Sequence, residues 1–241
     1  TSFKTPTLDV RRVTIGPISV KPSKMMRSAG ALMVNGCTLY MDRVAIKNNR
    51  SNAMMIKSPT AQYRITNSII ANNDLLSKSP SPAVALNGSG IFRFNTVVNN
   101  GDDAVMVPGG IQCPDRDPGA KVVEDSIVFH NRQVGDVQFL RNGMVPCDLG
   151  SVVVDSTEKD RSGLLKVDPK FASSFDRAKL ADFFDLSWVK LTADSPCIDK
   201  AAGPARDELP ESFKYWNWDY DGKRRPQGLY DIGATEYIGK Q

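Results

Sequence analysis

The sequence predicts an all-β fold, a right-handed parallel β-helix in which short strands stack coil upon coil. Three observations predict this solenoid. Short β-branched segments recur about 24 to 31 residues apart, asparagine-rich positions follow them, and further aliphatic segments come after most of these turns. Periods of this size are typical of stacked repeats rather than of a single layered core.

The first strand of each repeat begins with a polar residue and ends in a β-branched aliphatic residue. The five clearest copies are residues 12–15, 43–46, 67–70, 95–98 and 125–128, and a weaker sixth ends at Val154. Short β-branched segments between Asn, Gly, Ser and Pro are typical of strands joined by turns. Helical repeats would need longer segments with a 3.6-residue period, and leucine-rich repeats would need a leucine framework. The sequence contains neither.

Asparagine marks the corner after these strands. Asn48, Asn72, Asn100 and His130 come two positions after the last aliphatic residue, and Asn49, Asn73, Gly101 and Asn131 follow them. Asparagine tolerates a left-handed backbone and forms hydrogen bonds in turns. Stacked asparagines can also bond from coil to coil. The pattern therefore predicts an asparagine ladder, with His130 as one of its rungs rather than as a catalytic base.

A second strand is predicted after most of these corners, at residues 53–56, 83–86, 104–107 and 137–140. Equivalent aliphatic residues would then stack above one another and form a continuous core. Longer inserts are expected to leave the coils at residues 17–29, 74–82 and 108–119. The predicted coils occupy residues 1–155, and residues 156–241 form a C-terminal cap on the last coil within the same domain.

Composition and charge restrict the function classes. The hydrophobic content of 41% is enough for a core, and no run approaches the ~18 apolar residues that a membrane-spanning helix needs. No leader sequence precedes Thr1, so either a signal peptide has been removed or the chain begins within a longer protein. Up to Arg64 the chain has eleven Lys and Arg residues but only two acidic residues, Asp9 and Asp42, so this part has a net charge of +9. The whole chain has a net charge of +4, so the remainder has a net charge of −5. This asymmetry favours an anionic partner near the first coils, or it is a local excess on a solvated surface.

The four cysteines are Cys37, Cys113, Cys147 and Cys197, and the chain has a single histidine. No CxxC unit is present, which argues against zinc and haem sites. Cys113 and Cys147 both lie in loop-like segments that contain proline. They form a disulfide in an oxidising compartment, or they are free, buried thiols.

The last quarter of the chain carries a family resemblance. Ser-Pro-Cys-Ile-Asp at 195–199, Asp-Tyr-Asp-Gly-Lys-Arg-Arg-Pro at 219–226 and Asp-Ile-Gly-Ala-Thr-Glu-Tyr at 231–237 are its motifs. They resemble the closing segment of secreted bacterial β-helix-repeat proteins that end in SPxID, DxDGxxRPxG and DIGAxEY, the choice-of-anchor Q domain type. The resemblance implies a β-helix, export to the cell surface or the medium, and frequent association with polysaccharides. It does not imply one particular activity.

Two alternatives are open for the aromatic and acidic residues of this tail. Strand alternation would place Trp216, Trp218 and Tyr220 on one face, either packed against the terminal coil or exposed as a platform for sugar rings. On the other face, Asp219 and Asp221, with Asp231, would bind a calcium ion (Ca²⁺) or form a turn of the Asp-Gly type. The full calcium-loop pattern is missing.

One acidic pair is a candidate for catalysis. Asp102 and Asp103, in the segment Asn99-Asn-Gly-Asp-Asp, resemble the paired acids of β-helical polysaccharide hydrolases. Glycoside hydrolysis needs two carboxyl groups at a defined separation, whereas neighbours on a strand point to opposite sides. The other motifs of those enzymes are absent, and Asn-Gly-Asp is also an ordinary turn sequence.

Three functions are compatible with these observations. The first is an extracellular module that binds anionic polysaccharide, with Arg43, Lys47 and Arg50 as candidate contacts. The second is a polysaccharide lyase or glycoside hydrolase that uses Asp102 or Asp103. The third is a cell-surface scaffold or adhesion protein with a protein partner. Nucleic acid is not an expected partner, because few aromatic residues lie among the basic ones.

Overall fold

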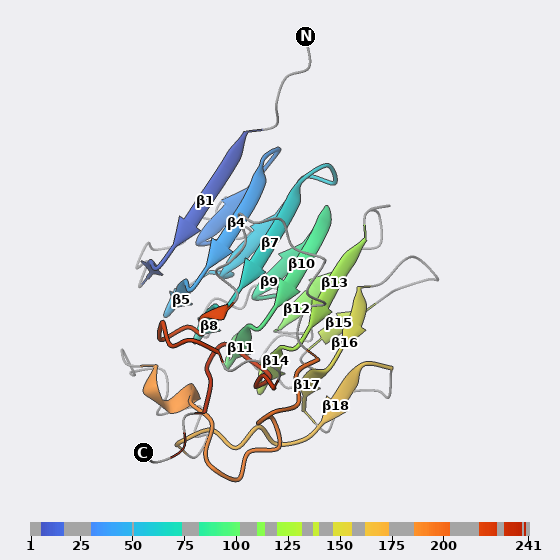
Figure 1. Ribbon diagram of the computed structural model, residues 1–241. Helices are drawn as coiled ribbons and strands as arrows, with labels where there is room; N and C mark the ends of the chain where they lie inside the picture. The colour runs from blue at the N-terminus through green and yellow to red at the C-terminus, as the bar shows by residue number, and fades with distance from the viewer. Residues whose placement is uncertain are drawn as a thin grey trace.

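The chain forms a parallel β-helix, which confirms the fold predicted from the sequence. The computed structural model describes residues 6–16, 30–49, 51–73, 82–101, 110–113, 120–131, 137–139, 147–155, 162–173, 186–202, 217–225, 229–237 and 239. All the paired strands of its three sheets run parallel, and each strand pairs with the equivalent strand of the next coil (Figure 1).

Each coil contributes at most one strand to each sheet, and the described strands number six in sheet A, seven in sheet B and five in sheet C. Sheet A consists of β1 (Thr7–Arg11), β4 (Thr38–Asp42), β7 (Gln62–Thr66), β10 (Ser89–Arg93), β13 (Lys121–Glu124) and β16 (Asp148–Gly150). Sheet B consists of β2 (Thr14–Ile15), β5 (Ala45–Lys47), β8 (Ile69–Ala71), β11 (Thr96–Val98), β14 (Ile127–Phe129), β17 (Val152–Val154) and β18 (Leu164–Lys166). Sheet C consists of β3 (Leu32–Val34), β6 (Met54–Ile56), β9 (Val84–Leu86), β12 (Ile111–Cys113) and β15 (Val137–Phe139). The short 3₁₀ helix η1 (Ser187–Val189) belongs to the tail.

The repeats found in the sequence lie in sheet B, and most of the predicted second strands lie in sheet C. The strands of sheet A had no counterpart in the prediction. Their inward residues, such as Leu39 and Met41 in β4, are buried, while outward residues such as Tyr40 are only half-buried. This alternation is the ordinary sign of a strand with one covered face. The alternation in sheet A does not form a clear repeat in the sequence, because the outward residues vary in chemistry from coil to coil.

The coil that contains β12 differs from the prediction. The strand that pairs with β9 is β12, which lies inside the expected insert 108–119. The expected strand 104–107 and most of the other two inserts lie outside the described residues. Both 104–107 and 111–113 contain aliphatic residues near a turn, so the sequence alone does not show which of them pairs with β9.

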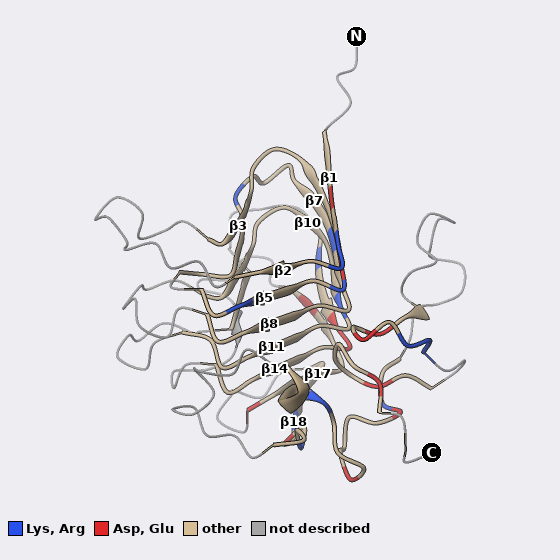
Figure 2. Ribbon diagram, turned by 90° about the vertical axis from the view of Figure 1, so that its left-hand side faces the viewer, with Lys and Arg blue, Asp and Glu red and all other residues tan. Residues whose placement is uncertain are grey.

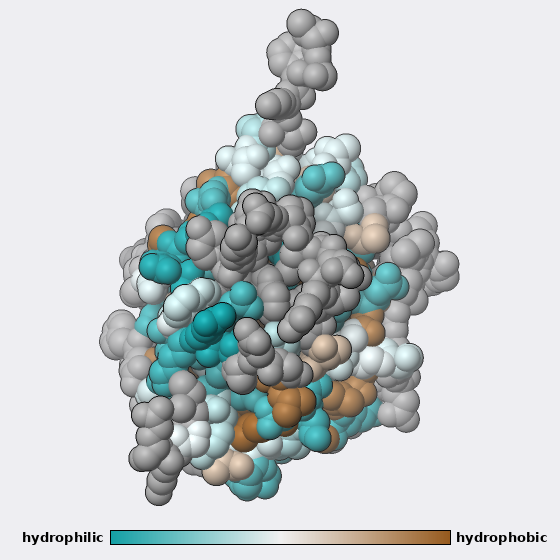
Figure 3. All heavy atoms as spheres, in the orientation of Figure 1, coloured by the Kyte–Doolittle hydropathy of each residue, from teal (hydrophilic) through white to brown (hydrophobic). Residues whose placement is uncertain are grey.

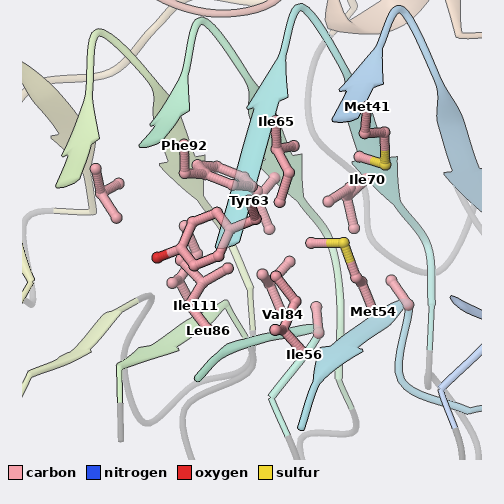
Figure 4. Packing of buried hydrophobic residues seen from close by; sticks show 14 of the residues in the cluster. Met41, Met54, Ile56, Tyr63, Ile65, Ile70, Val84, Leu86, Phe92 and Ile111 are labelled. Carbon is pink, nitrogen blue, oxygen red and sulfur yellow. The ribbon is translucent and has the colours of Figure 1, made fainter. Parts of the chain in front are cut away.

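The core fills the space between the three sheets. Figure 4 shows side chains from all three sheets converging there, with Met41, Ile65 and Phe92 from sheet A facing Met54, Val84 and Ile111 from sheet C. Ile70 of sheet B closes the third side. The burial of these side chains is the main favourable term in the folding of the solenoid.

The corners are tight because one residue in each adopts a left-handed backbone. Between sheets A and B this residue has a φ between 46° and 54° in every described coil: Arg12, Arg43, Asn67, Phe94, Asp125 and Ser151. After sheet B the equivalent residues are Asn48, Asn72, Asn99 and His130. Only some of these are asparagine, so the surrounding strands impose the conformation on the others, at a cost in strain.

An asparagine ladder follows the second of these corners. The side-chain Nδ2 of Asn49 donates to Oδ1 of Asn73 at 2.8 Å, Asn73 donates in the same way to Asn100 at 2.9 Å, and Asn100 donates to Asn131 at 2.8 Å. The same amides also donate to strand carbonyls inside the corner. The ladder thus satisfies buried backbone groups that a turn would otherwise leave without partners.

The predicted register of this ladder was wrong in one coil. Val97, not Val98, pairs with Ile70 and Val128, so Asn100 belongs to the ladder, and Asn99 is the left-handed residue before it. His130 follows Asn72 and Asn99 in a second stack, in which Asn99 donates to Asn72 at 2.6 Å, and its Nδ1 lies 3.0 Å from Oδ2 of Asp155. The predicted register was shifted by one residue because Val98, which faces outward, is also a β-branched aliphatic residue.

A disulfide links two neighbouring coils. Cys113 at the end of β12 and Cys147 just before β16 are bonded, with Cα atoms 5.9 Å apart. It is the pairing expected as one of the two alternatives for these cysteines. Cys37 is half-buried and Cys197 is buried, and both are free thiols.

We expect Asn100→Ala to lower the free energy of unfolding by about 3 kcal/mol, because several buried polar partners of its amide lose a hydrogen bond. Chemical denaturation followed by circular dichroism measures the change. Gln62→Ala is the control, since Gln62 is exposed on β7. A loss for Asn100→Ala no larger than that for the control would contradict a structural role for the ladder.

Burial raises the pKa of the Cys197 thiol to about 12. At about pH 8 this thiol stays protonated and unreactive in the native protein, because only the thiolate attacks alkylating reagents. Alkylation without reductant, followed by mass spectrometry, should modify Cys37 alone, and unfolding should add Cys197. Labelling of Cys113 or Cys147 before reduction would contradict the disulfide.

Candidate functional site

The tail covers one side of the solenoid. Most outward residues of sheet B are apolar, and Ala45, Ile69, Ala71 and Val98 pack against Leu186, Trp188, Val189 and Ala234 of the tail. Further along, Ile127, Phe129 and Val153 pack against Leu191, Cys197 and Ile232. The tail therefore runs back along sheet B towards the first coils (Figure 1, orange and red).

The described part of residues 156–241 therefore lies mainly along the outer face of sheet B, while β18 continues this sheet beyond β17. Within the described residues, β18 is the outermost strand of sheet B, and Leu165 and the neighbouring Val167 are 38% and 37% exposed. Hydrophobic residues also gather around the β17–β18 end of the face in Figure 3. The tail goes to the side because sheet B is apolar on both faces, and an uncovered outer face would leave a long apolar stripe in water.

A buried arginine fastens the tail to the coils. Arg225 forms an ion pair with Glu236, and its Nη2 donates to Oδ1 of Asn67 at 3.0 Å and to the carbonyl of Gly233 at 3.0 Å. Its guanidinium carbon lies 4.3 Å from the ring centroid of Phe94. Burial lowers the pKa of Arg225, and the nearby carboxylates oppose that shift. A buried charge of this kind is tolerated because Glu236 neutralises it and both Nη atoms are hydrogen-bonded, although Nε has no hydrogen-bond partner among the described residues.

Two of the three carboxylates proposed for calcium serve the tail itself. Asp219 accepts the backbone N–H groups of Lys223 at 2.7 Å and Glu236 at 3.1 Å. Asp231 accepts those of Asp199 at 2.9 Å and Tyr237 at 2.5 Å. Among the described residues, no group of three or more His, Cys, Asp or Glu side chains is placed to hold a metal ion. The turn alternative therefore describes these acids better, because their oxygens already fix the loop backbone.

A groove lies where the tail meets the first coils. Its larger hollow, about 420 Å³ in volume, is lined by Arg12, Val13, Thr14, Arg43, Trp218, Tyr220, Asp221 and Gly222. A smaller hollow of about 220 Å³ is lined by Lys47, Ile69, Leu186, Ser187, Lys190, Tyr220, Asp221 and Thr235. Because the two hollows share Tyr220 and Asp221, we treat them as one feature, the coil–tail groove.

The groove combines aromatic surface with positive charge. Trp218 is 39% exposed and lies with Tyr220 in the larger hollow. Four cationic side chains and one carboxylate line the groove: Arg12, Arg43, Lys47 and Lys190, with Asp221. Figure 2 shows basic residues (blue) along the corner where β1 passes into β2 and at the end of β5. Burial raises the pKa of Tyr220, as does the neighbouring Asp221, so its hydroxyl stays protonated at neutral pH.

Two ion pairs set the charges in the walls. Arg43 is buried, and its Nε donates to Oδ2 of Asp42 at 2.8 Å, so it forms a neutralised wall rather than the open contact that we predicted. Asp42 also accepts from Asn67, which in turn accepts from Arg225. On the tail side, Nζ of Lys190 lies 3.0 Å from Oδ2 of Asp221.

Several residues nominated from the sequence meet in this groove. Arg43, Lys47, Trp218 and Asp221 all line it, although they come from both ends of the chain. Asp221 joins Trp218 and Tyr220 because a turn at Asp219–Gly222 interrupts the expected alternation, with Gly222 N–H donating to Asp219 O at 3.0 Å. Arg50, Trp216, Asp102 and Asp103 lie outside the described residues.

Sequence reasoning missed two groove residues, Arg12 and Lys190. Arg12 was recognised only as the start of a strand, yet it is the exposed left-handed residue of the first corner, directly before Arg43 in the same stack. This position could have been found from the shared spacing of the two arginines in the repeat. No comparable pattern pointed to Lys190, which reaches the groove through the packing of η1 on sheet B.

Comparison with known proteins leaves the family unassigned, since the chain matches no protein-family model, no curated protein and no solved structure. In the part of the chain that the structure describes, no helix is long and apolar enough to cross a membrane.

We expect Arg225→Ala to reduce the free energy of unfolding by about 3 kcal/mol or more, because it leaves Glu236 buried without its cation. Denaturant unfolding measures the loss, and limited proteolysis should show earlier cleavage in the tail. Arg224→Ala is the matched control, since its side chain is exposed beside Arg225. Equal stability of the two variants would show that the pair does not fasten the tail.

Proposed function

We propose that this chain is an extracellular β-helix module that binds an anionic polysaccharide in the coil–tail groove. The observation that carries the proposal is the meeting of an exposed tryptophan, Trp218, with cationic side chains in a single groove. Aromatic rings and arginines are the side chains that dominate recognition surfaces. The β-helix fold itself is consistent with polysaccharide-binding modules.

The aromatic side of the groove suits a sugar ring. The C–H face of a pyranose is apolar and packs against a flat aromatic surface, while its hydroxyl groups need polar partners at the edges. Trp218 offers the exposed surface, and Tyr220 and Asp221 lie beside it with a hydroxyl and a carboxylate. The combined hollows are of the size that small-molecule sites usually have.

The charges of the groove favour an acidic chain over a neutral one. Four cations line the groove beside one carboxylate, Asp221, although Arg43 is already paired with Asp42 behind the wall. The segment up to Arg64 also has an excess of basic residues. Such a field attracts polyanions from a distance and weakens as salt is added.

The geometry of the coils suits a polymer. Arg12 and Arg43 occupy the same corner position in successive coils, about one strand spacing of 4.8 Å apart. Lys47, at the end of β5, extends the basic surface along the outer side of sheet B. Arg12 lines the larger hollow and Lys47 the smaller one, so a polymer that crosses both hollows passes both cations.

An extracellular location is supported by chemistry rather than by any match. The Cys113–Cys147 disulfide forms and persists in oxidising compartments. The motifs of the tail resemble those of secreted bacterial proteins, and that resemblance points to the cell surface or the medium.

We expect Trp218→Ala and Arg12→Ala each to weaken binding of an acidic polysaccharide by roughly tenfold, since central aromatic and arginine contacts cost above 1 kcal/mol when truncated. A screen of uronate-containing, sulfated and neutral polysaccharides at low and high salt identifies the ligand, and titration calorimetry measures the affinities.

The controls are Met33→Ala and Lys57→Ala, whose side chains are exposed outside the groove. Release of unsaturated products or reducing ends in the same screen would favour a lyase or hydrolase and direct attention to Asp102 and Asp103. Absence of any glycan binding would contradict the proposal and favour a scaffold with a protein partner.

A further inference from the structure

We infer that Asp221 is a built-in competitor of the ligand, whose own acidic group replaces the Asp221 carboxylate at Lys190. This inference rests on the proposed function, because it assigns a subsite within the same groove. It identifies the smaller hollow as the anion subsite and the larger hollow as the subsite where a sugar ring stacks.

The division follows from the lining of the two hollows. The larger one contains the exposed Trp218 and the exposed Arg12, while Arg43 in its wall is already paired with Asp42. The smaller one is lined by two lysines, Lys47 from β5 and Lys190 from the tail. At about 220 Å³, it is below the usual range for drug-sized ligands and suits one charged group on a single ring.

The Lys190–Asp221 pair is suited to exchange. The side chains of Lys190 and Asp221 are 47% and 26% exposed, so water screens their attraction. Ion pairs of this kind contribute little to stability, and an incoming carboxylate or sulfate can replace one oxygen ligand of the ammonium with another. Lys47 lines the same hollow, so its positive charge adds to the attraction for the anion.

Exchange has a consequence for the choice of ligand. A neutral sugar has no anionic group that can replace Asp221 at Lys190, so only its stacking on Trp218 contributes to binding. An acidic sugar gains both, provided that its neighbour in the chain reaches the larger hollow through the shared residues Tyr220 and Asp221. The groove therefore selects pairs of linked sugars of which at least one is acidic.

The test is Asp221→Asn, which removes the competing charge and keeps the shape of the side chain. The probes are immobilised polygalacturonate, alginate and dextran sulfate, with uncharged dextran as the neutral gel. We expect the variant to bind the charged gels about two- to fivefold more tightly than the wild type, the range that an exposed ion pair permits. Adding Lys190→Met to Asp221→Asn should abolish the gain.

The matched control is Asp194→Asn. Asp194 is the partner of Lys170 in a second Lys–Asp pair of the tail, outside the groove, and its replacement makes the same change in net charge. An increase shared by both variants would reflect net charge and overturn the inference. Unchanged or weaker binding by Asp221→Asn would also overturn the inference, provided that the wild type binds the charged gels and Trp218→Ala binds them more weakly. If no charged gel retains the wild type, the proposed function itself fails.

Discussion

Sheet B must be covered on both faces, and the rest of the structure depends on that constraint. Its strands carry apolar side chains inward to the core and outward to the tail, so strands such as β8 and β11 are buried throughout. Parallel sheets are normally covered in this way. The chain after β18 therefore returns along the coils, which brings residues near 220 beside residues near 12 and 43.

Hydrophobic contact alone would not fix the position of the tail, and a polar network does so. Arg225 links Glu236 and the Gly233 carbonyl in the tail to Asn67 in the corner of the third coil. Asn67 donates to Asp42, which also holds Arg43 in the wall of the groove. A buried charge that is paired with a carboxylate and hydrogen-bonded through both Nη atoms is costly to misplace, so the network specifies one docking position. The groove is thus built on the same contacts that stabilise the tail.

The groove is a product of this docking rather than of either part alone. The coils supply the left-handed corners and Lys47, and the tail supplies Trp218, Tyr220, Asp221 and Lys190. A ligand that contacts both parts binds only the docked state, so its binding stabilises the docking by mass action. Recognition at such a junction couples the affinity for the ligand to the integrity of the whole solenoid.

The sequence by itself determined the stacked coils, because a repeat of β-branched segments and asparagine corners is a local pattern that each coil must satisfy alone. It also nominated Arg43, Lys47, Trp218 and Asp221. It did not determine the register at Val97, the place of β12, or the side of the solenoid that the tail covers. Those features depend on which residues pair or pack although they lie far apart in the sequence. Asn67 and Arg225, for example, are in contact but are 158 residues apart in the chain. Only the tertiary structure decided that the aromatic tail and the basic coils meet in one groove, since burial of the outer face of sheet B selects that arrangement and no local pattern encodes it.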